Sequence, residues 1–181
     1  MPHYPVMTRE PTDSTAAAGQ ADDWARLCML LDDDPELAPA VRLAIEDPQA
    51  YRAEQQVVPG LPGAVPPPVT GPWQALLDGL DDAGALAYLD VGDAGMELAE
   101  ALAALPRVVG SGIDLEEVID LEGDLSGIIA VADALLAARG LRIVELEEEA
   151  DACALVVVPA GHVAEVVALV SQLGQVARGF S

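Results

Sequence analysis

Two aspartates three residues apart, Asp90 and Asp93, are the side chains whose type and spacing best suit chemistry. They bracket the end of an apolar run at residues 85–91 that predicts a strand, and the ends of strands often carry functional side chains. Carboxylate oxygens bind divalent cations, so the pair predicts a metal site. The alternative, which we favour, is that Asp93 caps the following helix and Asp90 is an exposed acid at the strand end.

A second acidic segment lies in a loop-like stretch, residues 107–124, with one helical turn expected at 115–119. Its acids lack the spacing of a calcium-binding loop. Acids without such spacing are usually solvated, but an exposed acidic loop attracts basic proteins. The predicted partner-binding residues are Asp114, Glu116, Glu117, Asp120 and Glu122.

Other catalytic chemistry has few side chains to draw on. The chain has no lysine for a phosphate-binding loop or a Schiff base, and its only histidines are His3 and His162. Motifs of serine hydrolases and P-loop enzymes are absent. The two cysteines, Cys28 and Cys153, fall in apolar patterns, which favours small core residues in a reducing cytosol over a disulfide or a catalytic thiol. We therefore expect no cofactor, and the balance favours a protein that is not an enzyme.

The net charge of −23 is the strongest compositional feature, and all eight basic residues are arginines. Such a field repels phosphate backbones and anionic lipid, so we expect neither nucleic-acid nor membrane binding. Cations and basic proteins are the partners that it attracts. A plainer interpretation, which carries more weight, is that surface acidity keeps an alanine-rich domain soluble. The alanine, glycine and arginine usage suggests a bacterial source.

We expect the protein to be cytoplasmic, because the N-terminus lacks the basic region followed by an apolar region that is typical of a secretion signal. Residues 153–170 are strongly apolar, but a Pro-Ala-Gly-His interruption and Glu165 argue against a membrane span.

The residues from 125 to 180 hold the clearest secondary-structure signal. Asp124 and Gly140 are a helix cap and a helix end, and they bound an apolar helical pattern in which Asp133 is expected on the polar side. Strands are predicted at 141–147 and 152–158, joined by an acidic turn into a hairpin. The second of these strands, ACALVVV, is apolar on both faces and predicts a central strand. A helix from about residue 160 to Gly174 and a short edge strand within 175–180 follow.

The N-terminal part divides by composition. Residues 1–20 are expected to form a disordered tail, and 21–56 an N-terminal helical segment. The proline-rich stretch 57–72 predicts a linker, followed by an α+β domain over 73–181. The helical segment is too short to hold a core alone, so we expect 21–181 to form one structural unit.

The predicted fold class is α+β, with an antiparallel or mixed four-stranded sheet. The element order over residues 85–180 approximates the split β-α-β arrangement of ferredoxin-like domains, with extra N-terminal helices. Helices are expected on one face of the sheet. The N-terminal helices, or a second subunit, would cover the other.

The segments GALAYLD, ADALLAARGLRIVELEEEADACALVVVP and VAEVVALVSQLGQ, in this order, resemble a family of small acidic bacterial proteins that is classed as a domain of unknown function. The resemblance covers about residues 73–180 and implies no activity. Members tend to carry Trp and Lys after the aspartate that matches Asp90, where this chain has Val91 and Gly92. They also tend to have an aromatic residue in the strand that here holds Cys153.

Three functions remain open at this point. The first is a non-enzymatic protein-binding domain, specifically an immunity-like or inhibitory protein that covers a basic partner through its acidic loop. The second is a metal-dependent hydrolase-type enzyme that uses Asp90 and Asp93. The third is self-association into a homodimer through an exposed face of the sheet.

Overall fold

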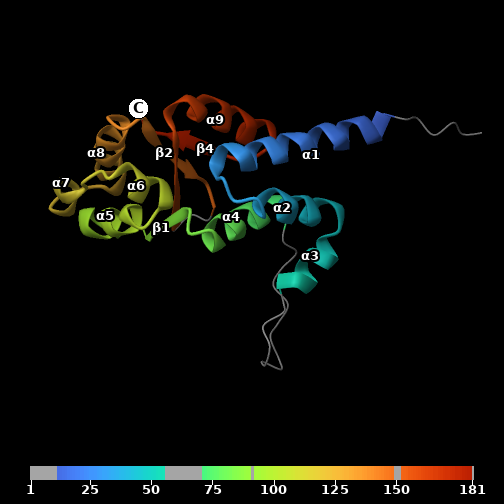
Figure 1. The fold of residues 1–181 in the computed structure, drawn as a ribbon, viewed down its shortest axis with the longest axis horizontal. Helices are drawn as coiled ribbons and strands as arrows, with labels where there is room; N and C mark the ends of the chain where they lie inside the picture. The colour runs from blue at the N-terminus through green and yellow to red at the C-terminus, as the bar shows by residue number, and fades with distance from the viewer. Residues whose placement is uncertain (1–11, 56–70, 91, 149–151, 181) are drawn as a thin grey trace, which may run out of the picture.

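A four-stranded antiparallel sheet stands between two groups of helices (Figure 1). The computed structural model describes residues 12–55, 71–90, 92–148 and 152–180. The strand order is β1-β3-β2-β4, which confirms the α+β class and the antiparallel sheet. The strands are β1 (Leu86–Asp90), β2 (Leu141–Leu146), β3 (Ala152–Pro159) and β4 (Ala177–Gly179).

The helices differ from the predicted pattern at two places. The first helix begins at Thr12, inside the stretch predicted as a tail, and Pro106 begins a helix because proline suits a first helical turn. The predicted linker 57–72 lies mostly outside the described residues. The helices are α1 (Thr12–Leu31), α2 (Leu37–Glu46), α3 (Pro48–Gln55), α4 (Pro72–Asp82), α5 (Gly95–Ala103), α6 (Pro106–Ser111), α7 (Glu116–Ile119), α8 (Leu125–Ala137) and α9 (Val163–Gln172).

The inner strand β3 joins two hydrophobic cores. It pairs with β1 on one side and with β2 on the other. Because successive side chains of a strand point to opposite faces, Leu155 and Val157 enter one core while Val156 and Val158 enter the other. The prediction of a central strand covered on both faces is confirmed. The apolar stretch 153–170 is divided between β3 and α9, and no helix in the described ranges is long and apolar enough to cross a bilayer.

The path of the chain explains why both faces of the sheet are covered. β1 and β2 are parallel with β3 between them, and β3 and β4 are parallel with β2 between them. The connection from β1 to β2 and the connection from β3 to β4 each pass over one strand, in the same direction across the sheet. They start from β1 and β3, which run in opposite directions. Since such crossovers share one hand in nearly all proteins, the two must cover opposite faces. Accordingly, α5 to α8 pack on one face, and α9 packs on the other with α1 to α4 (Figure 1).

This arrangement corrects the predicted layering. The sequence predicted the helices of the C-terminal part on one face, whereas α9 lies on the face of the N-terminal helices. The unit from β1 to β2 is a split β-α-β, because β3 lies between its strands. A ferredoxin-like topology is not confirmed, since it requires both crossover helices on the same face. The described helices cover both faces of the sheet, and self-association through a sheet face stays a prediction.

The N-terminal helices share a core with the sheet. Trp24 and Leu27 of α1 and Leu76 and Leu80 of α4 are at most 3% exposed and belong to the hydrophobic cluster that contains Val156. Each buried side chain of this size contributes about 1.5–3 kcal/mol relative to exposure. Within the described ranges, these helices and the sheet therefore form one packed body.

The contact between α5 and α7 generates a first prediction. A Cβ atom at Gly95 would overlap the backbone oxygens of Val118 and Leu121, which cannot move without shifting α7. We expect Gly95→Ala to lower the free energy of unfolding by about 2 kcal/mol, as measured by urea unfolding. Gly110→Ala is the control, because nothing lies within 4 Å of a Cβ there. Equal unfolding midpoints for the two variants would contradict this packing.

Candidate functional site

Asp90 and Asp93 close a turn between β1 and α5. The Asp93 Oδ2 atom accepts the N–H of Asp90 at 2.8 Å, and the Asp93 N–H donates to the carbonyl oxygen of Asp90 at 2.9 Å. The α5 terminus is served instead by Glu97, whose Oε2 atom accepts the N–H of Ala94 at 3.1 Å. The prediction that Asp93 caps this helix is therefore wrong. Its carboxylate holds the preceding turn because it reaches back to Asp90.

The same pair gains no third metal ligand from the part of the chain that the structure describes. No group of three or more His, Cys, Asp or Glu side chains that could hold a metal ion occurs there. Two carboxylates, one of them engaged with a backbone N–H, make a weak site for the oxygen-rich shells of Ca²⁺ or Mg²⁺. The metal site at Asp90 and Asp93 stays a prediction.

Asp93 lies at the rim of a cleft of about 590 Å³ between the β1–α5 turn, the N-terminus of α8 and the β2–β4 edge. Glu145 and Arg178 also line this cleft, and they form an ion pair with two hydrogen bonds, of 2.7 and 2.9 Å. Asp124 also lines the cleft, and its Oδ2 atom accepts the N–H of Gly127 at 2.9 Å, which confirms it as the cap of α8. Each of these carboxylates thus already has a partner within the fold.

The thiols are held in their protonated form. Burial, with a smaller contribution from the nearby Glu145 carboxylate, raises the pKa of Cys153 to about 12. Burial likewise raises the pKa of Cys28 to about 12. Because the thiolate is the nucleophilic species, neither cysteine is activated at neutral pH.

The acidic loop lies on and beside α7. Asp114, Glu116, Glu117, Asp120 and Glu122 are all exposed. The Asp114 Oδ1 atom accepts the N–H of Glu116 at 2.9 Å, which closes the turn that begins the helix. No ion pair joins any of the five to another described residue. We call this group the α7 surface.

Sequence reasoning missed a second acidic patch, around Tyr88 on β1. Tyr88 is 40% exposed, and burial followed by the charge of Glu148 raises its pKa above the usual range. Asp78 and Asp81 of α4 act in the same direction. These residues are distant in sequence, so the only available signal was an aromatic residue in a strand next to an acidic helix end.

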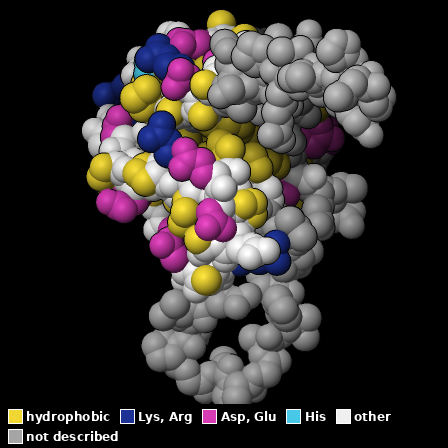
Figure 2. Space-filling view, turned by 90° about the vertical axis from the view of Figure 1, so that its right-hand side faces the viewer, with side chains coloured by type: hydrophobic (Ala, Val, Ile, Leu, Met, Phe, Trp, Pro, Cys, Tyr) yellow, Lys and Arg dark blue, Asp and Glu magenta, His cyan; other side chains and the backbone are white. Residues whose placement is uncertain are grey.

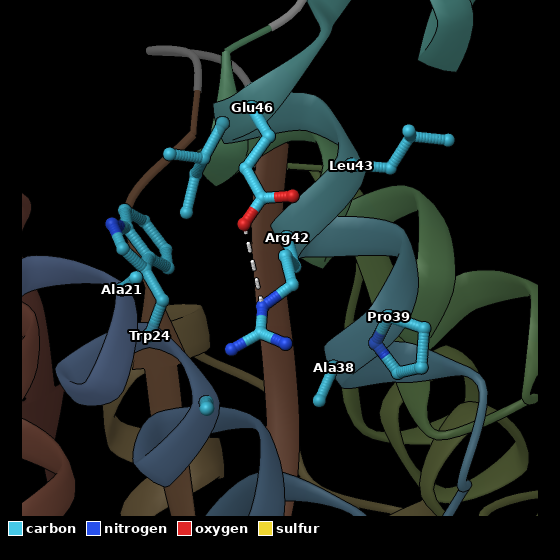
Figure 3. Close-up of a pocket in the computed structure, with 9 residues that line it drawn as sticks. Ala21, Trp24, Ala38, Pro39, Arg42, Leu43 and Glu46 are labelled. Atoms are coloured by element: carbon cyan, nitrogen blue, oxygen red, sulfur yellow. Dashed lines mark ion pairs between the residues drawn. The ribbon is translucent and has the colours of Figure 1, made fainter. Parts of the chain in front are cut away.

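An apolar groove of about 440 Å³ separates α1 from α2. Figure 2 views the end of the molecule where α1 to α3 lie, and hydrophobic side chains show there between charged ones. Figure 3 shows Arg42 and Glu46 of α2 facing Ala21 and Trp24 of α1. The Arg42 Nε atom lies 3.7 Å from the Glu46 Oε1 atom. Apart from this exposed pair, the groove has few polar groups to orient a ligand.

A buried ion pair that the sequence did not predict joins α8 to β2. Asp133 is 2% exposed. The Arg142 Nη2 atom donates to its Oδ2 atom at 2.7 Å, and the N–H of Ile143 donates to its Oδ1 atom at 2.7 Å. The same Nη2 atom also donates to the carbonyl oxygen of Phe180 at 2.7 Å. Placing Asp133 on the polar side of its helix was therefore wrong, because β2 supplies its partners.

Taken together, the fold and its surface define an acidic α+β domain with a covered sheet. The family described as a domain of unknown function, DUF6630, matches residues 23–180, and the chain belongs to this family. The resemblance was expected to begin at about residue 73, but the match includes the N-terminal helices, which agrees with their place in the shared core. Neither a curated protein nor a solved structure shows significant similarity to the chain.

The buried pair predicts a large loss of stability on removal of one partner. Asp133→Asn leaves the Arg142 guanidinium without its counter-charge, and we expect the free energy of unfolding to fall by about 3 kcal/mol. Urea unfolding followed by circular dichroism measures this change. Glu165→Gln is the control, because Glu165 pairs with Arg26 on the surface and its loss should leave the midpoint unchanged. An unchanged urea unfolding midpoint for Asp133→Asn would show that the ion pair does not stabilise the fold.

The raised thiol pKa values predict slow alkylation. At pH 8 a thiol with a pKa of about 12 has roughly a thousandfold less thiolate than one near its ordinary value. In the native protein, we expect Cys28 and Cys153 to react with iodoacetamide roughly a thousandfold more slowly than in urea. Their reaction rate should increase as the pH rises toward 12. Labelling at pH 8 is read by mass spectrometry. Similar rates in native and unfolded protein would show that the thiols are not held as described.

Proposed function

We propose that this chain is a non-enzymatic binding domain that docks on a basic protein, as acidic inhibitory or immunity-like proteins do. The α7 surface carries this proposal, because its five carboxylates are exposed and form no ion pair with a described residue. A partner with arginine or lysine at matching positions would find carboxylates that form no ion pair with a described residue, although the Asp114 Oδ1 atom already accepts the N–H of Glu116.

The charge around this surface supports long-range attraction. The sequence has no arginine, lysine or histidine from Val108 to Ala138, and among ion pairs between described residues only the buried Asp133 contributes an acid from that stretch. A single-sign field accelerates the encounter with an oppositely charged protein. The same field opposes binding to nucleic acid and to anionic membranes. We propose a cytoplasmic location for the protein.

The backbone under the α7 surface supports a fixed docking site. Val118 is fully buried, and the N–H of Gly95 donates to the carbonyl oxygen of Leu121 at 3.3 Å, which ties α7 to α5. Carboxylates on an anchored turn lose less conformational entropy on binding than those on a free loop. The α7 surface therefore suits recognition of a partner with a defined arrangement of basic groups.

The alternative, a metal-dependent hydrolase-type enzyme that uses Asp90 and Asp93, has weaker support. Asp93 is engaged in its own turn, and the cleft beside it presents carboxylates that are already partnered. A Mn²⁺ titration that perturbed a hydrolytic activity dependent on these two aspartates would favour this alternative.

The proposal predicts that neutralising the α7 surface abolishes partner binding. Immobilised wild-type protein is exposed to lysate of its source cells at low salt, and a basic protein should be retained and then released at high salt. The variant Glu116→Gln, Glu117→Gln, Glu122→Gln should lose that protein.

The control variant is Glu36→Gln, Glu54→Gln, Glu100→Gln, which removes the same three charges from other exposed positions. It should retain the partner, because recognition depends on the α7 surface rather than on net charge. Equal loss in both variants, or no retained basic protein at all, would overturn the proposal.

A further inference from the structure

The strand β1 is an outer strand of the sheet, and no described strand pairs with one of its two long edges. In the order β1-β3-β2-β4, it pairs only with β3. The helix α4 packs on one face of β1 and α5 packs on the other (Figure 1). The edge strand of a sheet offers N–H and C=O groups to which another extended chain can pair. We call this side of the strand the open edge of β1.

The turn after β1 shows which backbone groups point to the open edge. The N–H of Asp90 donates to the Oδ2 atom of Asp93 at 2.8 Å, so it points away from β3. Along an antiparallel strand, residues that bond to the neighbouring strand alternate with residues whose N–H and C=O point away from it. Tyr88, two residues before Asp90, and Leu86, two residues before that, therefore direct these groups to the open edge.

The register of the other strands agrees with this assignment. The N–H of Ile143 on β2 donates to a carboxylate of α8, so it does not bond to Val157, which faces it on β3. The backbone groups of Val157, and of Leu155 two residues earlier, therefore point toward β1. Leu155 faces Ala87 on β1. Ala87 is thus a residue that bonds to β3, and Tyr88 beside it points outward.

Tyr88 is the centre of the open edge. It is 40% exposed, and no backbone group of a described residue bonds to its outward N–H or C=O. The backbone of Asp90 is already engaged with Asp93. The edge that another chain can use is therefore centred on Tyr88 and includes Leu86. A residue that faced Tyr88 on an added antiparallel strand would exchange two hydrogen bonds with it.

The side chains beside Tyr88 favour a basic partner. Burial raises the pKa of its phenol, and so do the charges of three nearby carboxylates, Glu148, Asp81 and Asp78. The Asp90 side chain is exposed on the same face of β1. None of these four acids forms an ion pair with a described residue. An arginine or lysine opposite Tyr88 would therefore meet carboxylates and an aromatic ring, which both attract cations.

We propose that the open edge of β1 binds an extended basic segment of another protein, which adds to the sheet as an antiparallel strand with arginine or lysine at every second position. Main-chain bonds to Tyr88 hold the segment, and its alternate side chains reach the acids around the ring. Two copies of β1 fit each other less well, because the acids around the two Tyr88 rings would meet. The inference goes beyond the proposed function, since the site lies apart from the α7 surface and recognises the backbone of its partner.

The first test compares two fluorescent octapeptides in which arginine and threonine alternate. One carries N-methyl groups on all its arginine amides, and the other carries them on all its threonine amides. Because facing residues of antiparallel strands project to the same side of the sheet, an arginine whose side chain lies beside Tyr88 directs its N–H to β1. Fluorescence anisotropy should show that arginine methylation weakens binding about tenfold relative to threonine methylation, the loss expected for one or two hydrogen bonds. Equal affinities, or no saturable binding, would overturn the proposal.

The second test changes the strand itself. Proline is tolerated in an edge strand where its missing N–H would face away from the sheet. Tyr88→Pro should therefore keep the circular dichroism spectrum of the fold, but it should bind the unmethylated octapeptide about tenfold more weakly than Tyr88→Val. The valine variant is the matched control, because it also removes the ring and keeps the N–H. Equal binding by the two folded variants would contradict strand addition at this edge.

Two further measurements separate the open edge from other sites and occupants. The variant Glu116→Gln, Glu117→Gln, Glu122→Gln should bind the octapeptide with nearly the wild-type affinity, so this site can succeed or fail independently of the α7 surface. Loss of the peptide in that variant would assign the peptide to the α7 surface and overturn the proposal. A wild-type dimer in sedimentation equilibrium that Tyr88→Pro abolishes would assign the edge to a second copy and overturn it too.

Discussion

The buried Asp133 carboxylate is the interaction on which the C-terminal half of the fold depends. A charge so deeply buried is tolerated only when it is paired and hydrogen-bonded. Arg142 and the Ile143 N–H meet that requirement from β2, and Arg142 also binds the carbonyl oxygen of Phe180, just after β4. The Asp133–Arg142 pair therefore links α8, β2 and the residue that follows β4.

The covered sheet limits where the molecule can bind. The two crossovers place helices on opposite faces, and the N-terminal helices complete the second layer. The described helices cover both faces of the sheet, so the side chains that reach the surface there stand on helices and turns that pack inward. The α7 surface is one such place, and its five carboxylates are exposed.

The distribution of arginine explains why the surface field is so negative. Of the seven arginines in the described ranges, five form ion pairs with carboxylates of the same chain, and Arg107 also donates to the carbonyl oxygens of Leu31 and Val157. Much of the positive charge thus stabilises contacts between elements. The acids outnumber the arginines widely, and the exposed ones around α7 form no ion pair with a described residue.

The sequence by itself determined the elements whose signals are local. The Asp124 cap and Gly140 bound α8, and the unbroken apolar run of β3 predicted a central strand, because capping and periodicity depend on neighbouring residues. The tertiary structure decided the rest. Asp133 is buried, Asp93 binds its own turn and α9 lies beside the N-terminal helices, because each outcome depends on partners or strand order that local patterns do not encode. The exposure of the α7 carboxylates followed from sequence, but their anchoring at Gly95 needed the packing of α5 on α7.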